Sequence, residues 1–182
     1  METIIINDTN LQDGDIHKVG NKVRAVLLRD NNILISHYGG IVLLPGGSID
    51  KGETKEDAII RELEEETGII YNREELEELL TIKYYQPNYP TRDNKVINRL
   101  IITSYYLSNY KGIDLNNIKR TDKEQKDNFR LELIPVEKLL TQDVSNNPRR
   151  EYFDRELSEV SKELRKLRIW YSLFLRYNIY VE

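Results

Sequence analysis

The residues best suited to chemistry form a glutamate-rich segment in the first half of the chain. Glu62 is followed by Glu65 three positions later and by Glu66 four positions later. On an α-helix, residues three and four positions apart lie on one face. Carboxylates held that close repel one another, and a divalent cation removes the conflict. Because magnesium prefers oxygen ligands and keeps substrate phosphates in its shell, the segment predicts a Mg²⁺ site for phosphate chemistry.

Residues next to the glutamates favour the same interpretation. Gly46 and Gly47 lie upstream, where a free backbone carbonyl could join a metal shell. Glu53 precedes the expected helix near its positive end. Arg61 lies within the acidic stretch and could hold Glu53 or another carboxylate in place. The alternative is a solvent-exposed acidic helix face with no ligand, which is a common feature of proteins.

The helix that carries the glutamates is expected to follow Thr54. Thr54 is a suitable N-terminal cap, and Asp57 three residues later would complete a capping box. Gly68 supplies the left-handed residue that commonly ends a helix. The apolar side of this helix would consist of Ala58, Ile59, Ile60 and Leu63.

The surrounding segments predict a mixed fold. Runs rich in aliphatic, threonine and tyrosine residues predict strands at residues 3–7, 22–28, 33–37, 41–44, 81–85, 96–106 and 129–134. Residues 86–94, which contain two prolines, are expected to form a loop, and residues 135–140 a short helix. The order of strands, helix, strands and helix is typical of α/β or α+β layering.

A long helix is expected at the C-terminal end, from Arg150 to Tyr177. Its apolar residues alternate spacings of four and three, and they are Phe153, Leu157, Val160, Leu164, Leu167, Tyr171 and Phe174. The seam could pack on the domain's own surface, form a homodimer, or cover a neighbouring site as a lid. We therefore expect one domain at residues 1–148 and a helical extension at residues 149–182.

Composition limits the function classes. The chain of 182 residues contains no cysteine, which excludes disulfides, thiolate catalysis and cysteine-bound zinc. Its net charge of -4 and its lack of a basic run argue against nucleic acid or an anionic membrane as a partner. The N-terminal residues lack the basic region and apolar core of a signal peptide, and no segment could span a bilayer. A soluble cytoplasmic protein is expected.

The segment from Gly47 to Ile69 resembles the Nudix box, Gly-x5-Glu-x7-Arg-Glu-U-x-Glu-Glu-x-Gly-U, in which U is a bulky aliphatic residue. Every fixed position is matched, by Gly47, Glu53, Arg61, Glu62, Leu63, Glu65, Glu66, Gly68 and Ile69. The flanking sequences Leu-Leu-Pro-Gly-Gly and Phe-Arg-Leu-Glu-Leu-Ile-Pro-Val-Glu-Lys-Leu are also similar to the family. The similarity extends from about residue 23 to residue 140 and leaves the C-terminal helix outside.

The resemblance implies a Nudix-like α/β/α sandwich with a mixed central sheet. It also implies hydrolysis of a nucleoside diphosphate linked to another group, such as ADP-ribose, a nucleotide sugar or an oxidised nucleoside triphosphate, with Mg²⁺ or Mn²⁺. The implied metal ligands are Gly46, Glu62, Glu65 and Glu66, and Glu53, Arg61, Gly47 and Gly68 would support them. A Nudix-fold regulator that binds a nucleotide without cleaving it is the alternative, although such domains usually lose residues of the box.

The family also suggests residues outside the box. Many members carry an additional glutamate in the loop before the last core strand, where Glu124 is the first candidate and Asp127 the second. The catalytic set would then be Glu62, Glu65 and Glu124, with the water oriented or deprotonated by Glu62 or by the loop carboxylate. The alternative is a solvated charged loop. Residues suggested to contact the substrate are Arg24, Tyr85, Tyr89, Arg92 and Arg99.

Overall fold

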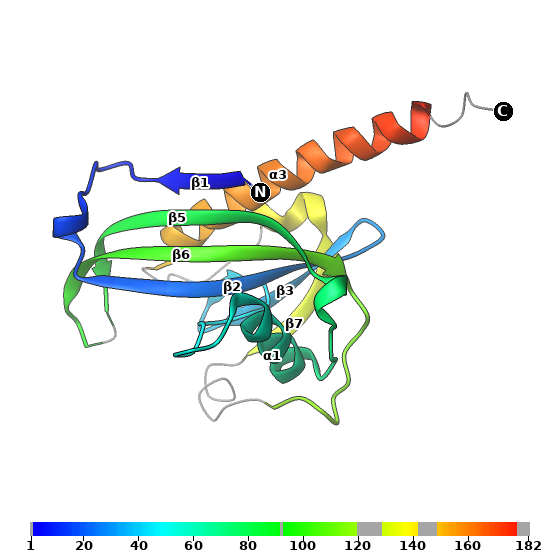
Figure 1. Cartoon of the computed structure of the whole chain (residues 1–182), viewed down its shortest axis with the longest axis horizontal. Coiled ribbons are helices and arrows are strands. Elements are labelled where there is room, and N and C mark those ends of the chain that lie inside the picture. The colour runs from blue at the N-terminus through cyan, green and yellow to red at the C-terminus, as the bar shows by residue number, and fades with distance from the viewer. Residues whose placement is uncertain (1, 92, 120–128, 142–148, 178–182) are drawn as a thin grey trace.

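The computed structural model describes residues 2–91, 93–119, 129–141 and 149–177 (Figure 1), and the side chains of its last helix as far as Leu167. The strands are β1 (Glu2–Ile6), β2 (Lys18–Arg29), β3 (Asn32–Tyr38), β4 (Ile41–Leu43), β5 (Glu77–Pro90), β6 (Val96–Asn109) and β7 (Arg130–Pro135). The α-helices are α1 (Lys55–Thr67) and α3 (Arg150–Tyr177). Short 3-10 helices occupy Asp13–Asp15, Arg73–Glu75 and Val136–Thr141.

The seven strands form one mixed sheet. Its order is β1-β5-β6-β2-β3-β4, and β7 pairs with β3. Strands β1 and β5 run parallel, as do β2 and β6, whereas the other pairs are antiparallel. Each of the seven strand segments expected from the sequence is present, with longer bounds for most of them. The expected mixed α/β fold is confirmed.

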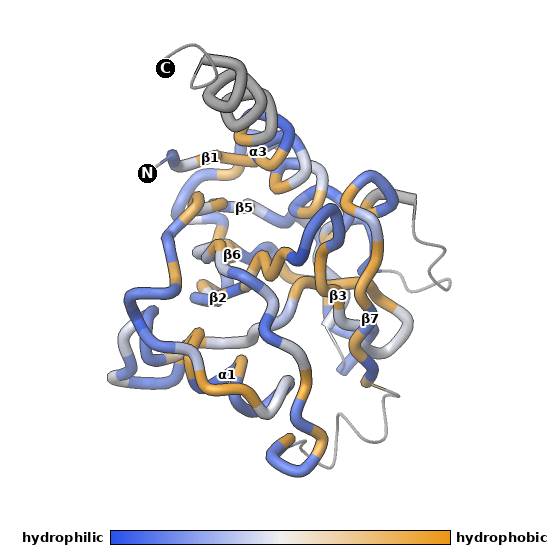
Figure 2. The backbone as a smooth tube through the Cα atoms, turned by 90° about the vertical axis from the view of Figure 1, so that its right-hand side faces the viewer, coloured by the Kyte–Doolittle hydropathy of each residue, from blue (hydrophilic) through white to orange (hydrophobic). Residues whose placement is uncertain are grey.

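Two helices cover opposite faces of the sheet (Figure 2). Successive side chains of a strand point to opposite faces, and β2 shows this alternation. Val23, Ala25 and Leu27 pack in the apolar cluster beneath α1, whereas Val26 packs in the cluster beneath α3. The helices contribute Ala58, Ile59 and Leu63 from α1 and Leu157, Val160 and Leu164 from α3. The sandwich therefore consists of α1, the sheet and α3, so the C-terminal helix, expected as an extension, forms one of its layers.

Helix α1 begins and ends as its sequence indicates, with one difference. The Thr54 hydroxyl accepts a hydrogen bond from the Asp57 backbone N–H at 3.1 Å. The Asp57 carboxylate accepts a hydrogen bond from the Thr54 hydroxyl at 2.6 Å. In a capping box this carboxylate would instead accept from the Thr54 backbone N–H. Aspartate is one methylene shorter than the glutamate usual at this position. At the other end, Gly68 has φ of 72° and donates its N–H to the Glu64 carbonyl at 2.9 Å.

The prediction of a loop at residues 86–94 is wrong for the first half of this segment. Strand β5 continues to Pro90, and the register with β6 shifts between Gln86 and Tyr89. Pro87 and Asn88 lie in this bulge, and Asn88 has φ of 51°. A bulge tolerates proline because its residues leave the ladder of hydrogen bonds. The reversal itself is shorter and is closed by the Thr91 N–H, which donates to the Lys95 carbonyl at 2.8 Å.

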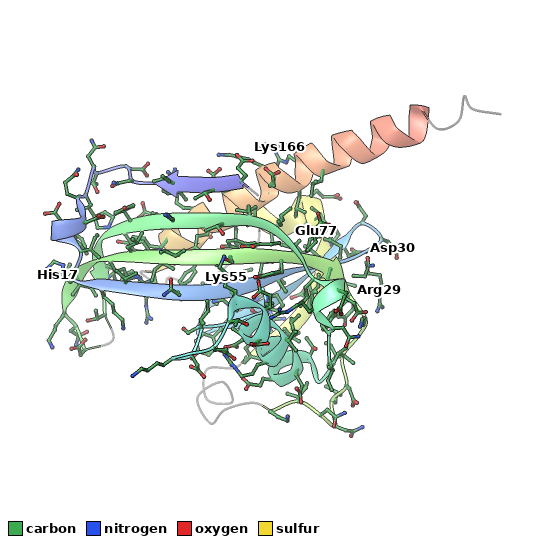
Figure 3. All side chains as sticks on the ribbon, viewed as in Figure 1. His17, Arg29, Asp30, Lys55, Glu77 and Lys166 are labelled. Atoms are coloured by element: carbon green, nitrogen blue, oxygen red, sulfur yellow. The ribbon has the colours of Figure 1, made fainter. Side chains whose placement is uncertain are left out.

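The first half of α3 packs on the domain's own surface. Leu157, Val160 and Leu164 are buried, whereas Leu167 is 37% exposed. Lys166 reaches Glu2 of β1 at 3.3 Å (Figure 3). The seam is therefore intramolecular at least as far as Leu164. Tyr171 and Phe174 have side chains outside the described residues, so homodimerisation through them stays a prediction.

A short aromatic group fixes the start of α3. The Tyr152 ring lies 5.2 Å from that of Tyr89 and 6.0 Å from that of Tyr84. Its hydroxyl donates to the Pro87 carbonyl at 2.6 Å. One turn later, Glu156 accepts a hydrogen bond from the Tyr105 hydroxyl at 2.7 Å.

None of the helices in the described part is both long and apolar enough to cross a membrane.

Candidate active site

A pocket of about 400 Å³ lies beside the glycine turn that precedes α1. The backbone of Gly46, Gly47 and Ser48 forms part of its wall. Its other lining side chains include the acidic Asp50, Glu62 and Glu66, the basic Lys22, Arg24 and Arg149, and the aromatic Tyr38, Tyr89, Phe129 and Phe153, together with Ser36, Ile41 and Leu43. Charged groups of both signs and aromatic rings therefore share one cavity.

The glycine turn approaches its neighbours more closely than other residues would allow. Gly46 has φ of 127°, and a β-carbon there would collide with the Val23 carbonyl. A β-carbon on Gly47 would overlap the carboxylate of Glu62. Both positions thus need glycine for steric reasons, and the backbone lies directly against the acidic face of α1.

Glu66 and Glu62 are the two box glutamates that line the pocket. Glu66 is only 5% exposed and accepts a hydrogen bond from the Gly46 N–H at 3.1 Å. Burial raises the pKa of Glu62, and the nearby Arg61 opposes this rise. A cation bound next to this carboxylate would stabilise its charged form.

Arg61 connects the acidic residues to one another. Its guanidinium holds Glu53 through two bonds, Nε to Oε1 at 2.8 Å and Nη2 to Oε2 at 3.0 Å. Its Nη1 lies 2.9 Å from Glu62 Oε1 and 3.4 Å from Glu65 Oε2. The hydrogen bond from Arg61 lowers the pKa of Glu53, and the pKa of Arg61 is raised in turn. The arginine therefore orients three carboxylates and also donates to the Ser48 carbonyl at 3.1 Å.

The donor set fits a hard divalent cation in part. Among the residues that the structure describes, no three acidic or histidine side chains lie close enough together to hold a metal ion, and Arg61 draws Glu62 and Glu65 toward itself. Glu62 and Glu66 nevertheless both line the pocket, and the Glu62 carboxylate lies directly against the glycine turn. Carboxylate and carbonyl oxygens are ligands that Mg²⁺ and Mn²⁺ accept. Glu65 is not among the residues that line the pocket.

The structure brings some of the predicted substrate residues to the pocket and not others. Arg24 lines the pocket, but its Nη1 donates to the carbonyls of Leu44 and Gly46, so it supports the turn. Tyr89 lines the pocket, and the Arg99 guanidinium lies 3.2 Å from the centre of its ring. Tyr85 is not brought to the pocket, since its hydroxyl points to Asp13 at 3.4 Å. The remaining predicted residues, Arg92, Glu124 and Asp127, lie outside the described residues.

The model of the NUDIX domain family matches residues 19–157, which is most of the chain. The chain belongs to the Nudix family. The match includes the start of α3, which the sequence resemblance left out. Members of the family generally use divalent metal cations.

Curated Nudix relatives match a shorter segment. An ADP-ribose pyrophosphatase of Methanocaldococcus jannaschii is 42% identical over 53 residues, 26% of this chain and 31% of that protein. An 8-oxo-dGTP diphosphatase of Haemophilus influenzae is 50% identical over 48 residues, 26% of this chain and 32% of that protein. The matched segment spans only about a third of the length of each of these relatives.

Solved structures share the Nudix fold at low identity. A MutT NUDIX hydrolase from Burkholderia pseudomallei has a TM-score of 0.53 at 21% identity, covering 78% of this chain and 98% of that one. The E. coli ORF135 protein has a TM-score of 0.53 at 18% identity, covering 85% of this chain and 94% of that one. These likenesses concern the fold.

Sequence reasoning missed Lys22 and Phe153 as residues of the pocket in this Nudix domain. Lys22 and Arg24 alternate with apolar Val23 and Ala25 on β2. This period of two puts both cations on one face of a buried strand, a signal that the sequence contained. Phe153 was recognised only as the first residue of the apolar seam, because no local pattern shows that the start of α3 reaches the pocket.

Proposed function

We propose that this Nudix protein is a divalent-metal-dependent pyrophosphohydrolase. Its substrate is a nucleoside diphosphate linked to another group, and its products are a nucleoside monophosphate and a phosphorylated remainder. The observation that supports this best is the pocket itself, in which Glu62 and Glu66 face a cavity that also holds basic and aromatic side chains. Such a cavity provides a partner for each part of a nucleotide.

The chemistry needs positioning and charge neutralisation and no covalent nucleophile. A cation held by Glu62, Glu65, Glu66 and the Gly46 carbonyl would neutralise charge on the diphosphate. The chain's own groups do the rest: Arg61 holds the glutamates in place, and Glu62 or a loop carboxylate, Glu124 or Asp127, orients or deprotonates the attacking water.

The size and lining of the pocket support a nucleotide. Its volume of about 400 Å³ lies in the range typical of small-molecule sites. Tyr38, Phe129 and Phe153 line the pocket, and aromatic rings are groups on which a base can stack. The names of the two curated relatives suggest ADP-ribose and 8-oxo-dGTP as the first substrates to test.

A product screen tests this function. The purified protein is incubated with ADP-ribose, nucleotide sugars, dinucleoside polyphosphates, dNTPs and 8-oxo-dGTP, with Mg²⁺ or Mn²⁺, and products are separated by chromatography. We expect a nucleoside monophosphate from at least one class and no product when a chelator is present. Absence of product from every class would contradict the proposal. Tight nucleotide binding measured by calorimetry without turnover would favour the regulator instead.

A further inference from the structure

Lys22 is a cation of the pocket whose side chain has no hydrogen bond and no ion pair in the described part of the chain. It lies on β2, and its backbone pairs with Ser48, next to the glycine turn. Its side chain is half-buried, and its Nζ lies 5.9 Å from the centre of the Phe153 ring. Partial burial of an ammonium without hydrogen-bonding partners disfavours its charged form.

The neighbouring cations are used differently. Arg24 donates hydrogen bonds from its Nη1 to the carbonyls of Leu44 and Gly46. Arg99 donates its Nε to Gln86 at 2.5 Å and stacks on Tyr89. Neither arginine forms an ion pair with a carboxylate of the described part of the chain. Lys22 is thus distinguished from both, because its ammonium protons are still available.

The surroundings of Lys22 are electrostatically suited to an anion. The charged groups that act on it are Arg24, Glu156, Arg99 and Glu62. Glu62 is paired with Arg61 at 2.9 Å, whereas Glu156 accepts a hydrogen bond from the uncharged Tyr105 hydroxyl at 2.7 Å. Glu156 alone therefore opposes the three cations Lys22, Arg24 and Arg99. The positive charges on this face of the sheet are therefore only partly balanced, in a chain whose net charge is -4. Such local fields attract anionic ligands.

We propose that Lys22 Nζ binds a phosphoryl group of the substrate, between the glutamates of α1 and the aromatic side chains of the pocket. This inference rests on the proposed function and adds a binding residue to it. The phosphoryl group can belong to the nucleoside monophosphate part of the substrate or to its remainder. Both sources present the same chemistry, and the experiment below separates them.

A role for Lys22 in the fold alone has a different consequence. Burial, and next the proximity of Arg24, lowers the pKa of Lys22 to about 8. The protonated ammonium is thus disfavoured in the folded state. Lys22→Met keeps the length of the side chain and removes the half-buried charge, so it should leave the melting temperature at pH 7 unchanged or raise it. A lysine kept for stability would show a lower melting temperature in this variant.

The test measures binding of reaction products by calorimetry, with a chelator and without divalent metal. The probes are AMP, ribose 5-phosphate and adenosine for ADP-ribose, and 8-oxo-dGMP, pyrophosphate and 8-oxo-deoxyguanosine for 8-oxo-dGTP. The proteins are the unaltered chain, Lys22→Met, Lys22→Arg and Lys18→Met. Lys18 is an exposed lysine of the same strand and controls for the loss of one positive charge.

We expect Lys22→Met to weaken binding of one phosphorylated product about 10- to 100-fold, because a charge-assisted hydrogen bond is lost. Binding of the unphosphorylated nucleoside should not change, Lys22→Arg should restore most of the affinity, and Lys18→Met should match the unaltered chain. The product that is affected identifies the phosphoryl group.

Three results would overturn the inference: unchanged binding in Lys22→Met, equal weakening for phosphorylated and unphosphorylated probes, or no binding of any phosphorylated probe by the unaltered chain. Failure of the proposed function is a separate result, because it appears as an absence of turnover by the unaltered chain with metal. Product binding without metal is measurable in either case.

Discussion

At Gly47 the backbone passes so close to α1 that one added methyl group would displace the Glu62 carboxylate. The fixed glycine of the box is therefore explained here by contact with a fixed glutamate of the same box. Gly47 is not among the residues with positive φ, so the conflict is with the side chain and not with the backbone conformation. Function should be more sensitive than stability to a change at this position.

Gly47→Ala tests this separation. We expect kcat to fall about 10-fold or more, because small displacements of catalytic groups are costly. The melting temperature should stay within about 4 °C, the shift that roughly 1 kcal/mol produces in a chain of this size. Gly14→Ala is the matched control, since a β-carbon there has nothing within 4 Å. Equal kcat values in the two variants would contradict the steric account.

The Glu53–Arg61 contact gives a pH dependence of stability. Hydrogen bonding by Arg61 lowers the pKa of Glu53 in the folded state. A carboxyl with a lowered folded pKa stabilises the fold above its unfolded pKa, about 4.3, and loses this contribution as the pH falls through the folded value. The melting temperature of the unaltered chain should therefore exceed that of Glu53→Gln at pH 7. This difference in melting temperature, the gap between the two proteins, should shrink as the pH falls below about 4.3. A gap that is constant from pH 7 to pH 3 would refute the pairing.

Residue patterns predicted the acidic end of the site better than the nucleotide end. The spacing of Glu62 and Glu66 on one helix turn is a local property, and the structure places both at the pocket. The partners of Arg24 are not local, because Leu44 and Gly46 reach it across strand pairs that no spacing rule specifies. Tyr85 does not line the pocket, and the reason is related: successive side chains of β5 point to opposite faces of the sheet.

At the scale of elements, α3 is part of the core. Three of its apolar residues are buried against the sheet, and the pocket is lined at one end by Phe153 from its first turn. The heptad-like spacing alone could not distinguish packing on the domain from packing on a second copy. The distinction depends on which sheet face lacks a helix, and this requires the topology.

Leu157→Ala should reveal that role. Leu157 is 5% exposed, and truncation of a buried leucine typically costs about 2–5 kcal/mol of unfolding free energy. Leu167→Ala, on the same helix at a residue that is 37% exposed, should cost less than about 1 kcal/mol. Denaturant unfolding of both variants measures the difference. Similar losses at the two positions would contradict the observed orientation of α3.

The length of β5 was also beyond the reach of local patterns. Two prolines indicated a loop, whereas pairing with β6 carries the strand through a bulge to Pro90. Tertiary pairing here outweighs the local signal. The consequence for the site is that Tyr89 stands on a rigid strand and not on a loop.

At the scale of the whole molecule, the sandwich brings its two helices to one pocket from opposite faces of the sheet. Helix α1 supplies carboxylates, and the start of α3 supplies the ring of Phe153. The strand β2 between them supplies Lys22 and Arg24. An overall negative chain can thus present local positive charge beside its acidic helix, the combination that a phosphorylated ligand with a bound cation requires. A cytoplasmic location stays a prediction from the sequence.

The most direct measurement of the central claim compares Glu66→Gln with Glu64→Gln in hydrolysis of the substrate found by the product screen. Both variants remove one negative charge from α1, but Glu66 lines the pocket, whereas Glu64 pairs with Lys119 at 2.6 Å. We predict that Glu66→Gln lowers kcat by about 100-fold or more. For Glu64→Gln we predict a kcat near that of the unaltered chain. A Glu66→Gln variant that is folded and as active as Glu64→Gln would contradict the assignment of this pocket as the active site.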